Sequence, residues 1–310
     1  MKYILAGIDG TGSKTWMRAD GYNSHVFRFL CDFMADRKQY WAGPGTFGFE
    51  MGGIVAEATQ WVATSAVELL KSGTRQEEIR VCLVGHSRGA VAAMEVASRL
   101  KNYKSAGLNG PIRVRFVGLY DAVDRSTLSF SGADLSNVDD LSHAVRQNRR
   151  FSGSRWSFGT VDVRRGRVNE YKEFDTAHGG VGGDPGYFDD LTGVAQDTYC
   201  NALTLVLSDA ELLKRYGNMA VPDPSGRDNV VLVPRYEQLK GAARDRRVEE
   251  LLTRWRASWE ADVWIRAAAT ASCGADRLAA TSPHHPFLEK DVNLAPRLAT
   301  ALCATSLSHQ

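Results

Sequence analysis

The sequence of 310 residues predicts an α/β protein with a mainly parallel sheet and helices on both of its faces. Short aliphatic runs such as Tyr3–Ile8 and Val81–Val84 are typical of strands that are buried on both sides. Segments with helical spacing of apolar residues follow these runs, and this alternation favours parallel strands joined by helices. With 44% hydrophobic and 24% charged residues, the composition is that of a globular chain with a sizeable core.

The first 71 residues predict two pairs of a strand and a helix. After the strand at Tyr3–Ile8, Asn23 is expected to cap a helix over His25–Met34. Gln39–Trp41 predicts the second strand, and the pattern from Glu50 to Lys71 predicts a long helix. The apolar side of that helix consists of Ile54, Ala58, Trp61, Val62 and Leu69.

The third strand, Val81–Val84, leads directly into Gly85-His-Ser-Arg-Gly89 and then into an Ala-rich helical pattern. A strand, a tight turn and a helix form the context in which Gly-x-Ser-x-Gly makes a nucleophile elbow. Only residues without a Cβ fit at the two ends of such a turn. We therefore expect Ser87 to be an exposed nucleophile, with the Arg88 N–H pointing at a developing oxyanion.

Two later segments supply the partners that a serine nucleophile needs. Asp121 follows the fourth predicted strand, at the edge where open α/β sheets bind ligands, and Asp124 is the alternative acid. His178 opens a glycine-rich loop after a strand predicted over Val168–Phe174. The order Ser, Asp, His is that of α/β-hydrolases, so Ser87 is expected as nucleophile, Asp121 as acid and His178 as general base.

The segments around these residues carry weaker patterns. Ile112–Leu119 predicts the fourth strand, and Asp139–Asn148 predicts a short helix that carries His143. Trp156–Val163 is expected as a strand that pairs with Val168–Phe174.

The loop after the first strand, Asp9-Gly-Thr-Gly-Ser13, suits a ligand or an anion because its glycines let backbone N–H groups approach it. Gly10 and Thr11 are therefore expected to complete the oxyanion hole. The stretch Gly7–Thr15 also resembles the first phosphate-binding loop of actin-like sugar kinases and ATPases, which requires a hairpin strand directly after it. A helix is expected there instead, so such a kinase is the alternative. A non-catalytic binding module with the hydrolase fold is a third hypothesis.

Composition changes at Val221–Gly226, where we place the boundary between a catalytic core (1–220) and a mostly helical extension packed on it (221–310). The extension contains an amphipathic helix over Arg244–Trp264. Its basic, Trp-bearing character fits contact with an anionic membrane surface, but covering the core is the simpler interpretation. The apolar stripe consists of Val248, Leu251, Leu252, Trp255 and Trp259.

Charge and cysteine content exclude several classes of protein. A net charge of +2, without a basic and aromatic track, argues against nucleic-acid binding. The five cysteines are scattered without Cys-x-x-Cys spacing, so neither a disulfide framework nor a metal site is expected, and no cofactor is implied. The N-terminus reaches Asp9 too soon for a signal peptide, and no apolar run could span a bilayer. We expect synthesis as a soluble cytoplasmic chain. The cysteines are Cys31, Cys82, Cys200, Cys273 and Cys303.

Six short motifs follow one another along residues 1–215. They are Asp9-Gly-Thr11, Asn23, Gly43-Pro-Gly-Thr46, Gly85-His-Ser-Arg-Gly-Ala90, Tyr120-Asp-Ala-Val123 and His178-Gly-Gly-Val-Gly-Gly183. In this order they resemble an α/β-hydrolase domain family, long filed as a domain of unknown function, that includes the phospholipase effectors of type VI secretion. The chain departs from the family at His86, where an aromatic residue is usual, and at Gly179 and Gly180.

The resemblance implies a serine esterase or lipase that acts on lipid or phospholipid acyl esters, with Ser87, Asp121 and His178 as the triad. For an exported antibacterial effector it also implies a contact-dependent secretion system, secretion-apparatus and immunity partners, and contact with a membrane surface. The large membrane-anchoring insertion of the best-known effectors is missing from this sequence. Ester hydrolysis is therefore the broader expectation and phospholipid the narrower one.

Overall fold

The computed structural model describes residues 1–11, 24–45, 48–104, 107–123, 133–146, 169–176, 178–183 and 242–278, with the backbone alone at 169 and 242–256. Its six strands form a single sheet in the order β2-β1-β3-β4-β5-β6, and every neighbouring pair is parallel. The predicted α/β fold with a mainly parallel sheet is confirmed. The strands are β1 (Lys2–Ile8), β2 (Arg37–Trp41), β3 (Ile79–His86), β4 (Val114–Tyr120), β5 (Val138–Arg146) and β6 (Asn169–Phe174).

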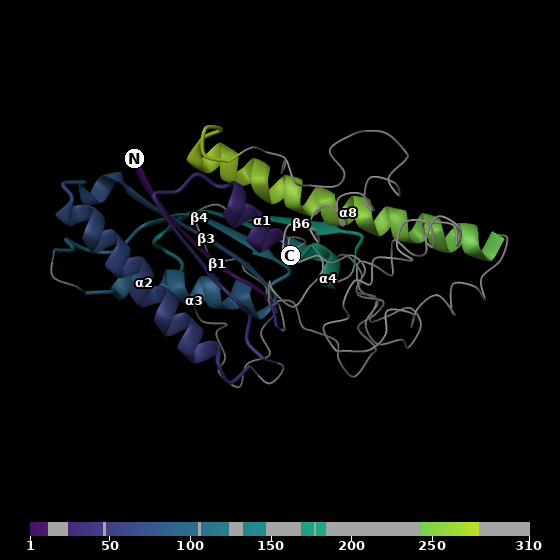
Figure 1. Ribbon diagram of the computed structural model, residues 1–310, viewed down its shortest axis with the longest axis horizontal. Coiled ribbons are helices and arrows are strands. Elements are labelled where there is room, and N and C mark those ends of the chain that lie inside the picture. Colours follow the sequence, from purple (N-terminus) through teal and green to yellow (C-terminus); the bar gives the residue numbers. More distant parts are fainter. Residues whose placement is uncertain are drawn as a thin grey trace, which may run out of the picture.

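Helices cover both faces of this sheet (Figure 1). Two of them, α2 and α3, lie on one face, and α1 and α8 lie on the other. The helices are α1 (His25–Asp32), α2 (Met51–Lys71), α3 (Arg88–Asn102), the single turn α4 (His178–Val181) and α8 (Ala242–Cys273), with a 3₁₀ turn η2 at Gln76–Glu78.

Strand β1 is covered by helices on both faces, which explains why its sequence is apolar. Ile4 and Ile8 belong to the core beneath α2 and α3, whereas Tyr3 and Leu5 belong to the core beneath α1 and α8. Successive side chains of a strand point to opposite faces, so a strand covered on both sides needs apolar residues at every position. Both neighbours of β1 run parallel to it. That pairing leaves no hairpin partner beside β1, which contradicts the actin-like kinase alternative.

Helix α1 begins one residue later than its predicted cap implied. Ser24 is the N-cap, and its hydroxyl accepts a hydrogen bond from the Phe27 N–H at 3.3 Å. Asn23 lies outside the described residues. The predicted strand Trp156–Val163, the alternative acid Asp124 and the boundary near residue 220 lie outside them as well.

The helix predicted over Asp139–Asn148 is wrong, because residues 139–146, the described part of this segment, belong to strand β5. It pairs in parallel with β4 on one side and β6 on the other, which buries His143 almost completely. In the sequence alone, Asp139 and Asp140 resemble the solvent-exposed face of a helix. In the fold they accept hydrogen bonds from side chains of β4 and α8.

Helix α8 packs its second half against the sheet, on β4 and β5 (Figure 1). A stripe of mainly small buried residues makes this contact. A Cβ placed on Gly118 of β4 would lie 3.0 Å from the Cγ2 atom of Ile265. A larger residue at Gly118 would therefore push the helix away. The stripe consists of Ala257, Ala261, Ile265 and Ala269. The predicted helix over Arg244–Trp264 is present and extends to Cys273, whereas the side chains of its predicted apolar stripe before Trp259 lie outside the described residues.

A buried polar network also holds α8 in place. Arg266 is fully buried and donates to Asp262 at 2.8 Å and to Asp32 of α1 at 2.9 Å. The Tyr120 hydroxyl, at the end of β4, donates to Asp262 at 2.9 Å. The Nη1 atom of Arg266 has no hydrogen-bond partner among the described residues, and a buried ion pair of this kind adds little net stability. None of the helices within the described ranges has the length and apolar composition needed to cross a membrane.

Candidate active site

The sharp turn between β3 and α3 contains Ser87 in an unusual backbone conformation, with φ 57° and ψ −126°. Residues with a Cβ rarely adopt this region, so surrounding contacts must hold it. The Ser87 N–H donates to the Tyr120 carbonyl at 3.0 Å, and the Ser87 carbonyl accepts from the N–H groups of Ala90 and Val123. The turn therefore has the geometry of the predicted nucleophile elbow.

Both glycines of the motif are required by close backbone contacts. A Cβ on Gly85 would lie 2.4 Å from the Gly89 carbonyl oxygen. A Cβ on Gly89 would lie 2.3 Å from the Asp9 carbonyl oxygen, on the neighbouring strand end. Contacts this short do not occur between real Cβ and backbone atoms, so the spacing of the motif follows directly from the packing of β1, β3 and α3.

The structure brings Ser87, His178 and Asp121 together from three separate segments. The Nε2 atom of His178 lies 2.8 Å from the Ser87 Oγ, and its Nδ1 lies 2.7 Å from Oδ2 of Asp121. Because a carboxylate only accepts hydrogen bonds, Nδ1 carries the proton. The lone pair of Nε2 then faces the serine hydroxyl, which is the tautomer that a general base needs.

Asp121 is completely buried at the carboxyl end of β4, also with a positive φ of 43°. Its N–H donates to the Ala144 carbonyl at 2.7 Å, and Arg146 donates to its Oδ2 at 2.9 Å. Burial alone would raise the pKa of Asp121, but the hydrogen bond from His178 and the charges of His178 and Arg146 outweigh burial and lower that pKa. Asp121 is thus a carboxylate at neutral pH.

One expectation about the serine is wrong: Ser87 is not exposed. Only 5% of its surface is accessible, whereas the His178 side chain keeps 18%. The elbow encloses the serine backbone, and the Oγ atom lies against the imidazole.

The predicted oxyanion residues lie beside the elbow, but one predicted donor is occupied. The N–H of Gly10 donates to Oδ1 of its neighbour Asp9 at 2.8 Å. Arg88 is the first residue of α3, where backbone N–H groups lie outside the helical hydrogen-bond ladder. Its guanidinium donates to the Gly45 carbonyl at 3.2 Å. Thr11 is half-buried at the end of the described loop.

Asp9 is a site residue whose role the sequence pattern did not indicate. Its buried carboxylate accepts the Gly10 N–H, the Ser24 hydroxyl and, at 2.8 Å, the Tyr40 hydroxyl. It thereby ties the ends of β1 and β2 to the start of α1. In the sequence, the signals for this role of Asp9 were Ser24, next to the predicted helix cap, and Tyr40, near the end of the second strand.

His86 and Arg146 were missed as well. The His86 Nε2 lies 3.2 Å from the His178 carbonyl oxygen, and its Nδ1 lies 3.9 Å from Asp9 Oδ1. Arg146 was missed because its strand was interpreted as a helix, which hid its position at the same sheet edge as Asp121. A correct strand assignment would have indicated it.

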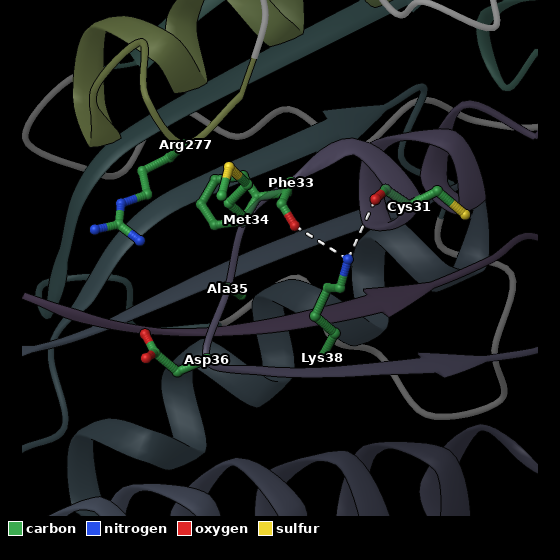
Figure 2. Close-up of a pocket in the computed structure, with 7 residues that line it drawn as sticks. All are labelled: Cys31, Phe33, Met34, Ala35, Asp36, Lys38 and Arg277. Atoms are coloured by element: carbon green, nitrogen blue, oxygen red, sulfur yellow. Dashed lines mark hydrogen bonds between the residues drawn. The ribbon is translucent and has the colours of Figure 1, made fainter.

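A surface pocket near the α1–β2 connection does not coincide with this site (Figure 2). Lys38, which lines it, donates to three carbonyls at the C-terminal end of α1. Asp36 accepts the Tyr3 N–H at the amino end of β1. The pocket is therefore at the amino edge of the sheet, whereas Ser87 follows the carboxyl end of β3. Its lining is Cys31, Phe33, Met34, Ala35, Asp36, Lys38 and Arg277.

The architecture is α/β-hydrolase-like. No protein-family model and no curated protein matches the chain. Among solved structures, a Tle1 effector bound to the VgrG spike of a Type 6 secretion system is 17% identical, with a TM-score of 0.38, over 59% of this chain and 51% of that one. An uncharacterized protein from Pseudomonas aeruginosa is 14% identical, with a TM-score of 0.39, over 100% of this chain and 59% of that one. This chain thus spans 51% and 59% of their lengths. Similarity at this level does not indicate an activity.

Proposed function

We propose that this protein is a serine hydrolase that cleaves carboxylic esters through a covalent acyl-enzyme. The observation that carries the proposal is the position of the His178 imidazole, 2.8 Å from the Ser87 Oγ and 2.7 Å from a buried Asp121 oxygen. A serine in an elbow turn, an imidazole in the correct tautomer and an ionised acid are the three parts that nucleophilic acyl transfer requires.

The reaction proceeds in two half-reactions. His178 Nε2 takes the proton of Ser87 as the Oγ attacks the ester carbonyl, and the same proton passes to the departing alcohol. In the second half-reaction Nε2 takes a proton from water as the water oxygen attacks the acyl carbonyl, and it returns that proton to the Ser87 Oγ as the bond between Oγ and the acyl carbon breaks and the carboxylic acid leaves. Asp121 keeps Nδ1 protonated and stabilises the imidazolium that forms in each step.

Backbone N–H groups beside Ser87 would stabilise the tetrahedral oxyanion. Arg88 supplies one of them and Thr11 the other, because the Gly10 N–H already donates to Asp9. Each such donor is typically worth about 3 kcal/mol of transition-state stabilisation. Gly10 contributes by keeping the loop close, since a Cβ placed on it would lie only 3.1 Å from the Ser87 Cβ.

The substrate class is the narrower part of the proposal. The order of six motifs along the chain supports lipid or phospholipid acyl esters, and with them a role as an exported effector that meets a secretion apparatus, an immunity partner and a membrane surface. Ester hydrolysis itself depends only on the side chains around Ser87.

The direct test is labelling by a fluorophosphonate, which reacts only with an activated serine. Wild-type protein should be labelled at Ser87 and should hydrolyse a short-chain p-nitrophenyl ester. Ser87→Ala should lose labelling and about 10⁶-fold in kcat, and Asp121→Asn about 10⁴-fold. Ser72→Ala, on the opposite side of the fold from the elbow, is the matched control and should keep both. Wild-type protein that is neither labelled nor active would instead indicate the non-catalytic binding module.

A further inference from the structure

The carboxylate of Asp121 has a second partner besides the imidazole. Arg146, at the end of β5, donates through Nη1 to Oδ2 of Asp121 at 2.9 Å. The same oxygen accepts Nδ1 of His178 at 2.7 Å. The Arg146 side chain is 16% exposed and Asp121 is 0% exposed, so water screens this ion pair only weakly.

Two donors on one oxygen compete for its charge. A guanidinium is always charged, whereas an imidazole becomes charged only when it takes a proton. Because Arg146 already neutralises much of the carboxylate charge, protonating His178 gains less electrostatic stabilisation than it would beside a bare carboxylate. The guanidinium also fixes the direction of the carboxylate towards Nδ1, since the two contacts share one oxygen.

From this geometry we propose that Arg146 is a positioning residue that holds Asp121 against His178. Its charge keeps the imidazole unprotonated, and so able to act as a base, at lower pH than without Arg146. The inference rests on the proposed function for its meaning in catalysis, but the coupling of the three side chains does not require turnover. Arg146 acts through Asp121, the acid that its Nη1 contacts.

Other titratable and charged groups face the same pair from the surrounding elements. From β3, the His86 ring is centred 4.9 Å from the His178 ring, and Asp9 after β1 stands 3.9 Å beyond it. From β5, the Nε2 of His143 accepts the Ala122 N–H at 3.0 Å. From α1, the Nδ1 of His25 donates to the Val181 carbonyl. From α8, Asp262 and Arg266 form an ion pair with each other. Arg146 differs from these in being a permanent cation in direct contact with the acid.

The test compares Arg146→Gln, which removes the charge, with Arg146→Lys, which keeps it. The rate of fluorophosphonate labelling at Ser87 is measured against pH. In Arg146→Gln the acid limb of the profile should move up by about one pH unit. At one pH unit below the wild-type midpoint, the labelling rate of Arg146→Gln relative to wild type should therefore be several-fold lower than it is on the plateau. Arg146→Lys should restore most of that shift. Arg113→Gln removes an arginine beside Asp139 at the other end of the sheet and is the control. A profile of Arg146→Gln that superimposes on the wild type would overturn the proposal.

A second measurement needs no activity. The His178 imidazole is titrated by ¹³C-resolved NMR, with its signal assigned by its loss in His178→Gln. Its midpoint should move to higher pH in Arg146→Gln and to lower pH in Asp121→Asn, where the guanidinium is left facing the ring without its carboxylate. If Arg146→Gln does not fold, Arg146→Met is titrated in its place, and a midpoint that does not rise overturns the coupling. Failure of the proposed function is distinct, because it appears as unlabelled Ser87 in wild-type protein whatever the titration shows.

Discussion

Replacing Ser87 with glycine should make the protein more stable than replacing it with alanine, although both changes remove the hydroxyl. The reason is the backbone of the elbow, where Ser87 has φ 57° and ψ −126°. Alanine keeps a Cβ in this strained region, and glycine does not. Both variants lose the hydrogen bond to His178, so that contact cancels in the comparison.

The magnitude follows from two opposing contributions. Backbone strain of this kind costs about 1–3 kcal/mol. Glycine gives back roughly 0.5–1 kcal/mol, because it gains more conformational freedom in the unfolded chain. Ser87→Gly should therefore exceed Ser87→Ala in free energy of unfolding by about 0.5–2 kcal/mol, or by about 1–3 °C in Tm for a chain of this size.

Urea unfolding followed by tryptophan fluorescence measures this difference. Ser72, at the end of α2, is the matched control because its φ of −80° suits any residue. There glycine should be less stable than alanine by about 0.5–1 kcal/mol, so the sign reverses. If Ser87→Gly is no more stable than Ser87→Ala, the strain attributed to the elbow is absent and the argument for an elbow fails.

Three other changes test the packing around the site by urea unfolding. Gly85→Ala should destabilise the protein by about 1–3 kcal/mol, because its Cβ would lie 2.4 Å from the Gly89 carbonyl; unchanged stability would contradict this. Burial lowers the pKa of His25 to about 4, so as the pH falls from 6.5 to 4 the unfolded chain binds a proton at His25 and the native state does not. The free energy of unfolding should decrease by on the order of 3 kcal/mol as the pH is lowered through that range, and His25→Gln should make it depend less on pH. Arg266→Met should cost about 3–5 kcal/mol by leaving Asp262 buried without its cation, and adding Asp262→Asn should recover part of the loss.

The nucleophile turn could be predicted from sequence because its requirements are local. Gly85 and Gly89 are separated by the three residues of a single turn, and the strand and helix on either side adjoin them. His178 and Asp121 were predicted from chain order and from their positions after strands. Both inferences use the general property that the carboxyl ends of parallel strands meet at one edge.

Other features depend on contacts that no local pattern reveals. The polar residues of β5 find partners on β4 and α8, the latter more than a hundred residues away, so their spacing alone indicated a helix. That misassignment removed Arg146 from the predicted site. The Gly10 N–H donates to the side chain of its own neighbour Asp9, a choice that depends on Ser24 and Tyr40 closing around the same carboxylate.

Strand register explains why these residues meet at all. Ile8 of β1 pairs with Gly85, and His86 pairs with Tyr120 of β4, so Gly10, Ser87 and Asp121 leave their strands at one level. On β5 the partner of Tyr120 is Ala144, which places Arg146 within reach of the same carboxylate.

This alignment depends on one irregularity at the far end of the sheet. Val81 pairs with Val114, but Cys82 pairs with Phe116, so β4 contains one extra residue relative to β3. Without it His86 would pair with Leu119, and Ser87 would stand beside Tyr120 instead of Asp121. A shift of one residue also turns every side chain of a strand to the other face. The acid is therefore brought to the imidazole by the extra residue in β4 as much as by the elbow itself.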